Sequence, residues 1–145
     1  AKETSEATKD PSDFCIIIFR RMKGESPPMP VAFYKDRPSD VREAYRIALK
    51  LLEYYNCKAL LEFSKIGFKN FLVDKRIEHK WLMRRTKATL DSPDAISRQY
   101  GVPANEKVIQ HQLELLASYV QDFGDNIWFI EIINELLEYS YENKR

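Results

Sequence analysis

The chain alternates between short apolar runs and longer stretches with helical periodicity. Residues 14–22 ("FCIIIFRRM") and 31–35 ("VAFYK") are rich in β-branched and aromatic side chains and flank a Gly/Pro-rich connection. This pattern predicts two strands joined as a hairpin. A third apolar run at residues 58–63 predicts another strand, and residues 80–84 ("KWLMR") a fourth, shorter one.

Helical periodicity first appears after the hairpin. Ser39 or Asp40 is the expected N-cap, and Asn56 ends the helix. The expected apolar face consists of Val41, Ala44, Tyr45, Ala48, Leu51, Leu52 and Tyr55. A strand reached through a helix is most simply the parallel neighbour of the strand before it, so residues 58–63 are expected to pair in parallel with the sheet.

Three further helices are expected in the second half of the chain. A short one follows Gly67 and turns Phe68, Phe71 and Leu72 inward, and the last one runs through Ile130, Ile133, Leu136 and Leu137. Between them, a helix over residues 106–123 is capped by Asn105, with Gly124 at C′ and a buried stripe of Ile109, Leu113, Leu116 and Val120. The order β-β-α-β-α-β-α-α predicts a single α/β domain over residues 1–145, with a mixed sheet. Its predicted core includes Leu51, Leu52, Leu60, Leu116 and Ile133.

Composition narrows the class of protein to a soluble globular domain but does not indicate a function. The chain has 145 residues, 44% hydrophobic and 31% charged, which is ordinary for a soluble domain with one core. A net charge of +1 favours neither nucleic acid nor membrane, so any basic surface has to be local. Without a signal peptide or a bilayer-length apolar run, a cytosolic protein is expected. Cys15 and Cys57 lie in or beside apolar runs and are expected to be buried, reduced and unpaired.

Several familiar kinds of site are disfavoured by the sequence. The four glycines are scattered singly, so there is no phosphate-binding loop, and no Ser or Cys lies in a nucleophile elbow. His79 and His111 are the only histidines. A zinc site at His111 is much less expected than a surface histidine.

Glu62 is the residue with the clearest potential for chemistry. It follows Ala59, Leu60 and Leu61 at the end of the predicted third strand. A carboxylate there is costly unless it is paired, and a divalent cation is one possible partner. The alternative is that Glu62 lies past the last strand hydrogen bond and faces water.

Other acidic and basic residues fall near the same strand ends. Asp10 and Asp13 precede the first strand and Asp36 follows the second, either as turn formers or as further ligands. Basic residues follow the third and fourth strands, either on a solvated face or along a polyanion-binding edge: Lys65, Lys69, Arg84, Arg85 and Lys87. Carboxylates at strand ends with a basic rim are what two-metal phosphodiester cleavage requires.

The central part of the chain resembles the nuclease domain of bacteriophage large terminases, the DNA-packaging motors. The resemblance rests on Tyr-x-x-Arg-Pro at residues 34–38 before a helix closing in Leu-Glu-Tyr-Tyr-Asn, and on a strand ending in Glu62 that is followed by Lys65 and Gly67. The later pieces "KWLMRRTK", "YGVPAN" and "IINELLEYSYENKR" fall where that domain has its fifth strand, a glycine turn and its last helices.

The resemblance implies a ribonuclease-H-like fold and two Mg²⁺ or Mn²⁺ ions held by three acidic residues. Glu62 matches the second of these, and Asp13, or less well Asp10, matches a further acidic residue. The first belongs to a central strand that is expected before residue 1, and the third is expected beyond residue 145. The chain is therefore expected to lack its central strand, to be inactive alone, and to follow an ATPase domain in a longer polypeptide.

The implied function is endonucleolytic cleavage of concatemeric DNA during phage genome packaging in the host cytoplasm. The implied partners are double-stranded DNA, the portal and the small terminase subunit, with no membrane. One alternative is a ribonuclease-H-like module without catalysis that docks on DNA or on a portal-like protein. Another is a small phage protein whose similarity reflects only a fold-level pattern.

Overall fold

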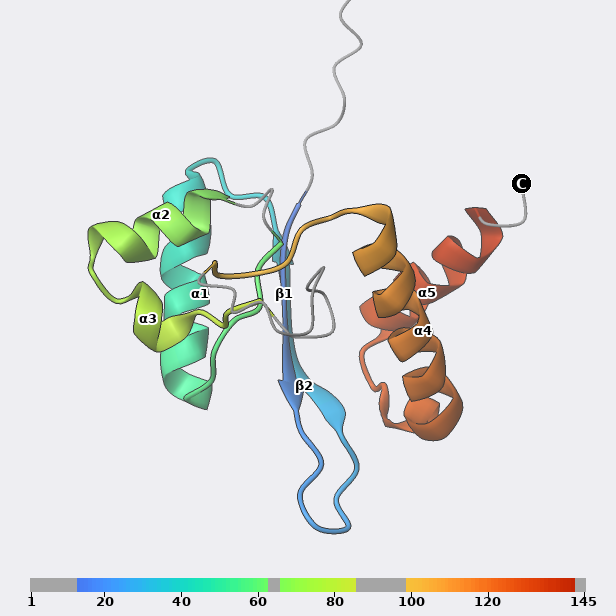
Figure 1. Cartoon of the computed structure of the whole chain (residues 1–145). Coiled ribbons are helices and arrows are strands. Elements are labelled where there is room, and N and C mark those ends of the chain that lie inside the picture. Colours follow the sequence, from blue (N-terminus) through green and yellow to red (C-terminus); the bar gives the residue numbers. More distant parts are fainter. Residues whose placement is uncertain (1–12, 63–65, 86–98, 143–145) are drawn as a thin grey trace, which may run out of the picture.

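An antiparallel hairpin lies between two groups of helices in the computed structural model of this chain, which describes residues 13–62, 66–85 and 99–142 (Figure 1). The hairpin consists of β1 (Phe14–Arg20) and β2 (Met29–Asp36). One group of helices comprises α1 (Val41–Tyr55), α2 (Ile66–Asp74) and α3 (Glu78–Trp81). The other comprises α4 (Glu106–Phe123) and α5 (Ile130–Glu142), joined through the 3₁₀ turn η2 (Gly124–Asn126). The predicted α/β class and the predicted hairpin are confirmed.

Side chains of β1 alternate between the two groups of helices, as the period of a strand requires. The ring of Phe14 meets that of Tyr45 in α1 edge-on, with centroids 5.8 Å apart, and Ile16 packs against the same core. Phe19 instead meets Tyr119 of α4, with centroids 5.2 Å apart. An irregularity in the pairing between Ile18 and Phe19 falls within this strand.

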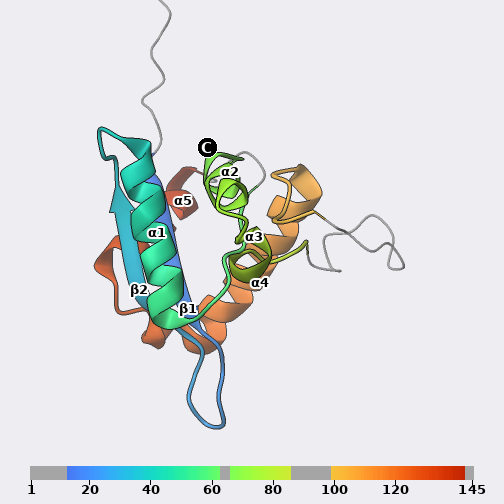
Figure 2. The same ribbon diagram turned by 90° about the vertical axis from the view of Figure 1, so that its left-hand side faces the viewer.

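Helix α1 covers one face of the hairpin (Figure 2). Asp40 is its N-cap, and its carboxylate accepts a hydrogen bond from the backbone N–H of Arg42 at 3.0 Å. Asn56 ends the helix in the left-handed region at φ 47°, a conformation that asparagine tolerates better than most residues. The predicted cap, end and apolar face are confirmed, although Val41 and Tyr55 at the ends of that face are exposed.

The main core lies between α1, α2, α3 and the hairpin. Its buried members are Ala48, Leu52, Phe68, Leu72, Trp81 and Leu82. Gly67 lets α2 approach α1 closely, since a Cβ at this position would collide with the hydroxyl of Tyr45. The inward direction predicted for Phe68 and Leu72 is confirmed.

The contact with α4 and α5 is sparser. Phe33 of β2 faces Phe129 with ring centroids 6.3 Å apart, and the hydroxyl of Tyr119 donates to the carbonyl of Pro28 at 2.8 Å. The stripe predicted for α4 is wrong: Val108 is its buried residue, while Ile109, Leu116 and Val120 are exposed. Neighbouring positions on a helix are about 100° apart, so α4 presents a different face than the apolar stripe suggested.

The end of α4 also differs from the prediction. Gly124 has right-handed helical dihedrals, φ −56° and ψ −32°, because the chain continues into η2 instead of turning at a left-handed residue. In α5, Ile130 and Leu137 are exposed. The sequence also predicts a helical turn near residues 92–100, and most of that stretch lies outside the described residues.

The third and fourth strands do not join the hairpin as predicted. In the part of the chain that the structure describes, the sheet has two strands, β1 and β2. Residues 57–62 run extended, but form parallel bridges from Ala59 to Leu82 and from Glu62 to Val102. Lys80 and Trp81 belong to α3, and only the residues after them are extended, with Arg84 bridged to Tyr100. The expected mixed sheet is thus divided into two separately paired parts.

This division explains the errors in the predicted core. Leu52 is buried as predicted, and Leu51 and Ile133 are half-buried. The predicted burial of Leu60 is wrong, because this residue is 44% exposed at the place where the sheet is divided. Cys15 is exposed and Cys57 half-buried, so their predicted burial is wrong, although both are unpaired as expected.

Leu82 and Leu60 offer a matched test of this core, because both lie on extended segments but are 1% and 44% exposed. Leu82→Ala should lower the free energy of unfolding by about 2–5 kcal/mol, since it leaves a cavity. Leu60→Ala should cost about 1 kcal/mol or less, since its side chain already meets solvent. Urea unfolding measures both. Equal costs for the two variants would contradict the division of the sheet.

Candidate functional site

A groove of about 1070 Å³ separates β1 from residues 57–62. Every residue from Asp13 to Phe19 lines one edge of it, and every residue from Cys57 to Glu62 lines the other. Its base is formed by residues of α1 and α2, including Tyr45, Ala48, Leu52, Gly67 and Phe68. The predicted third strand, residues 58–63, was instead expected to pair directly with the sheet.

The two edges of the groove run in opposite directions. In Figure 1, β1 descends, α1 descends after the return of β2, and residues 57–62 ascend. The start of β1 and the end of residues 57–62 therefore lie at the same end of the groove. Asp13 and Glu62 are the lining residues at these two positions.

Backbone pairing holds the segment that carries Glu62 on the side away from the groove. Ala59 donates to the carbonyl of Trp81 at 2.8 Å and accepts from the N–H of Met83 at 2.8 Å. Leu61 accepts from the N–H of Val102 at 2.8 Å. Gly101 has φ +87° and passes so close that a Cβ would collide with the carbonyl oxygen of Leu61. Glu62 is consequently fixed by its backbone, while its side chain is exposed.

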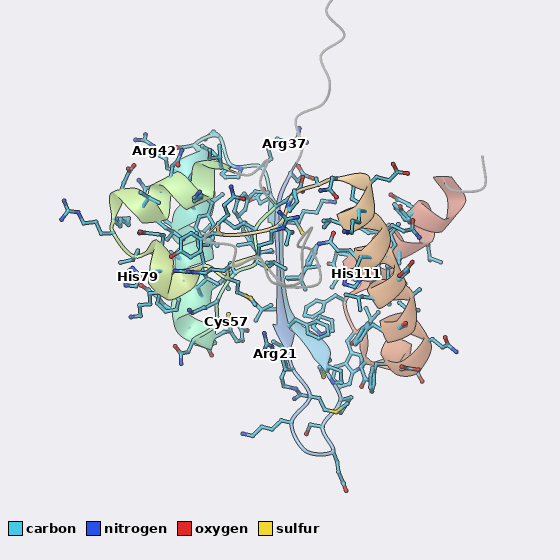
Figure 3. The ribbon with its side chains drawn as sticks, in the orientation of Figure 1. Arg21, Arg37, Arg42, Cys57, His79 and His111 are labelled. Carbon is cyan, nitrogen blue, oxygen red and sulfur yellow. The ribbon has the colours of Figure 1, made fainter. Side chains whose placement is uncertain are left out.

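Asp13 is held by two cationic side chains. Its Oδ1 lies 3.0 Å from a guanidinium nitrogen of Arg37, and its Oδ2 lies 3.9 Å from Nζ of Lys35. Figure 3 shows Arg37 at the end of the hairpin where β1 begins. Lys35 is bonded more closely to Glu135 of α5, at 2.7 Å, and this hydrogen bond raises the pKa of Lys35. The predictions for this end did not include Arg37 or Lys35, although Arg37 lies in the Tyr-x-x-Arg-Pro stretch.

The donors at this end suit a hard cation, but they are few. Carboxylate oxygens are preferred by Mg²⁺ and Mn²⁺, and one or two carboxylates bind such ions weakly. Within residues 13–62, 66–85 and 99–142, no group of three or more His, Cys, Asp or Glu side chains could hold a metal. Asp10, the other acidic candidate, lies outside the described residues.

The predicted basic residues are only partly described. Arg84 is exposed, with its guanidinium 5.8 Å from the ring centroid of Tyr100, and Arg85 donates its backbone N–H to Gln99 at 3.1 Å. Lys69 is half-buried in α2. Lys65 and Lys87 lie outside the described residues. Stacking on an aromatic ring orders a guanidinium while leaving its donors available, as phosphate binding requires.

Both cysteines line the groove, from opposite edges. Partial desolvation by the surrounding groups raises the pKa of both thiols, although Cys15 is exposed and Cys57 half-buried by surface area, and the nearby Lys35 acts in the lowering direction on Cys15. A raised pKa keeps a thiol protonated at neutral pH, where it is a poor nucleophile. This disfavours a catalytic role for either cysteine.

Comparisons of the chain with family models, with curated proteins and with solved structures found no match. Among the described helices, none combines the length and apolarity that crossing a bilayer demands.

The thiols should react with iodoacetamide only at elevated pH. In the folded chain the midpoint of the pH–rate profile should lie above the ordinary value of about 8.5, and in urea it should return to that value. Because the folded state holds the thiol proton more tightly than the unfolded state, stability should fall as pH rises past about 8.5. Identical midpoints in buffer and in urea would contradict the desolvation of Cys15 and Cys57.

Proposed function

We propose that this chain is most of a ribonuclease-H-like nuclease domain of the phage large terminase type, which cleaves DNA with divalent metal ions. The observation that supports this most is the spatial order of the extended segments: β2, β1, the groove, residues 57–62, and then residues 82–84 and 99–102. A ribonuclease-H-like sheet without its central strand would leave a gap of this kind. The proposed central strand lies upstream in a longer polypeptide.

The proposed metal ligands are Glu62 and Asp13, completed by carboxylates from outside the chain. Divalent ions at this end would activate a water and neutralise the phosphate. Glu62 suits the role because its backbone is fixed by pairing while its side chain is exposed. Asp13 would have to loosen its ion pairs with Arg37 and Lys35, and these two cations would then be available to an anionic substrate.

DNA would be positioned by the basic residues, while the carboxylates act at the scissile phosphate. Arg84 is exposed and ordered by Tyr100, and Arg85 is its neighbour on the same segment. Contacts of this kind fix the register of a duplex without reading its sequence. The proposed substrate is therefore double-stranded DNA of any sequence.

A non-catalytic docking module of the same fold is the second candidate. It is favoured by the two cations that already neutralise Asp13, because a carboxylate paired with Arg37 and Lys35 gives up part of its affinity for a metal ion. In that case the portal or the DNA would be bound and never cut.

Glu62→Ala distinguishes the two candidates in the full-length polypeptide that contains this chain. With Mg²⁺ or Mn²⁺, the unsubstituted protein should linearise supercoiled plasmid, and Glu62→Ala should abolish cleavage while DNA binding persists. The reason is that loss of one ligand carboxylate removes the ions that supply the reaction. Residues 1–145 alone should bind the metal weakly and not cleave.

Glu53→Ala is the matched control, since Glu53 is an exposed glutamate near the end of α1, at the other end of the groove. It should leave cleavage unchanged. Cleavage by Glu62→Ala at the unsubstituted rate would refute the nuclease assignment of Glu62, which would then be a solvated residue at the end of an extended segment.

Binding of duplex DNA should depend steeply on salt, because phosphate contacts release counterions. The double variant Arg84→Gln with Arg85→Gln should reduce the slope of log K against log[salt] by roughly 2. A variant with Arg46→Gln and Lys50→Gln, on the exposed side of α1, removes the same charge and should change the slope little. Fluorescence anisotropy measures both, and equal effects would argue against a specific basic edge.

A further inference from the structure

We propose that α4 binds a basic amphipathic helix of another protein, which packs along an exposed apolar seam of α4 and is held there by the negative charge of α4 and α5. The seam consists of Ile109, Leu113, Leu116 and Val120. This inference rests on the described surface of these helices and holds whether or not the domain cleaves DNA.

The seam has the spacing with which one helix packs against another. Its residues follow one another at intervals of four, three and four, which is the heptad pattern. At about 100° per residue, all four fall within about 60° of the circumference of α4. Ile109, Leu116 and Val120 are 43%, 39% and 41% exposed, and Leu113 is half-buried. A row of large apolar side chains is thus left partly open along about three turns of the helix.

Contacts between α4 and the hairpin use a different face of the helix. Val108 is buried, and Tyr119 meets the ring of Phe19 and donates its hydroxyl to the carbonyl of Pro28. Val108 and Tyr119 lie within about 20° of each other around the helix, and about 100° from the middle of the seam. Helices α4 and α5 come close to one another mainly at the η2 turn. The described contacts therefore leave the seam available to a partner.

The charge of the chain is divided between the two sides of the molecule. Residues 106–142, which form α4, η2 and α5, contain eight Asp or Glu and one Lys, a formal charge of −7. Residues 13–85, which form the hairpin and α1 to α3, contain sixteen Lys or Arg and nine Asp or Glu, a formal charge of +7. Because α4 and α5 lie across the hairpin from α1 to α3 (Figure 1), the small net charge of the chain conceals an acidic side and a basic side.

The acidic side chains of α4, η2 and α5 are open to solvent. The structure describes the side chains of seven of the eight, and all seven are exposed. Among the described residues, one ion pair involves them, between Glu135 and Lys35. On α5, Glu131, Glu135 and Glu138 recur at intervals of four and three, where like charges repel each other along a helix. Cationic side chains of a partner would relieve this repulsion.

Charge decides which class of partner fits the seam. A nucleic acid or an anionic membrane would be repelled by this side of the molecule. A second copy of the chain would present a matching apolar seam but the same negative charge. A helix with Lys or Arg beside an apolar stripe suits both features, since its apolar face packs on the seam and its cations meet the carboxylates. The occupant is therefore a basic amphipathic helix.

The experiment uses residues 1–145, labelled with ¹⁵N, and the synthetic peptide acetyl-IAKLKKAIAKLKKAIAKL-amide as the probe. This peptide carries an apolar stripe at heptad spacing among lysines. Binding should shift the amide resonances of residues 109–120 most strongly and should increase the helicity of the peptide. High salt should weaken binding at least about tenfold, because ions screen the attraction between the lysines and the carboxylates. Shifts confined to the hairpin or α1, or no binding at millimolar peptide, would overturn the proposal.

Two control peptides separate the apolar stripe from the charge. One has the same composition, but its apolar residues are scattered around the helix. The other keeps the stripe and has Glu in place of every Lys. Each should bind at least about tenfold more weakly than the probe, because each lacks one of the two features that the seam recognises. Equal binding by either control would contradict the proposal.

Leu116→Lys and Leu115→Lys form a matched pair of variants. These neighbouring residues of α4 are 39% and 58% exposed and would gain the same charge, but Leu115 lies off the seam. Leu116→Lys should weaken binding of the probe at least about tenfold, because a charge would face the apolar stripe. Leu115→Lys should weaken binding less than about threefold, since it lowers only the overall negative charge.

Circular dichroism checks that both variants fold. If Leu116→Lys does not fold, Val120→Lys replaces it at a second exposed position of the seam. Equal weakening by the seam variant and by Leu115→Lys would overturn the proposal. A dimer of the chain that the seam variant dissociates would overturn it as well, because the seam would then bind a second copy.

Discussion

Backbone pairing on one side only is the constraint on which this structure depends. The hairpin and residues 57–62 each satisfy one edge, the first through β1 and β2 and the second through residues 81–84 and 99–102. Because the two groups do not pair with each other, a groove opens between them, and its apolar lining is half exposed. The position of Glu62, the exposure of Leu60 and the shape of the candidate site all follow from this division.

Helix α1 holds the hairpin and the second set of paired segments, residues 57–62, 81–84 and 99–102, together. Ala44, Ala48 and Leu52 recur at intervals of four, so that one face of the helix is buried along its length. Small residues in two of these positions let α1 lie close to the hairpin, while Leu52 reaches the core shared with α2 and α3. The groove thus has a fixed base although its two edges are not bonded to each other. A preformed base of this kind reduces the ordering that a bound segment would require.

The sequence predicted the local structure well, because local signals determine it. Asp40 as the cap, Asn56 as the end of α1 and the Gly/Pro connection of the hairpin all act within a few residues, and all were confirmed. The pairing of residues 57–62 was not predictable in this way, since the choice of partner edge depends on segments far away in the chain. Leu60 was expected to be buried because an apolar run resembles a core strand, whichever edge is available to it.

The candidate site shows the same limit. Strand ends predicted that Asp13 and Glu62 would reach the same edge, and both residues line the groove. The engagement of Asp13 by Arg37 and Lys35 was missed, because these residues lie across the hairpin from it and their contact is set by the register of β1 and β2. Likewise, the exposure of apolar residues on α4 and α5 could not be predicted from periodicity. Periodicity identifies the apolar face of a helix, but not which other element, if any, packs against that face.

The open edge of β1 also bears on the colloidal behaviour of the chain. Residues 14–19 ("FCIIIF") are consecutively apolar or aromatic, uncharged and free of proline, the composition of segments that stack into cross-β assemblies. In most proteins such a segment is paired on both sides, whereas here one side borders the groove. Arg20 and Arg21, which follow directly, place positive charge at the end of the segment, where repulsion between copies opposes stacking. Solubility of the chain would then be sensitive to salt, because ions that screen these arginines weaken the repulsion between copies and allow the unpaired edge of β1 to stack.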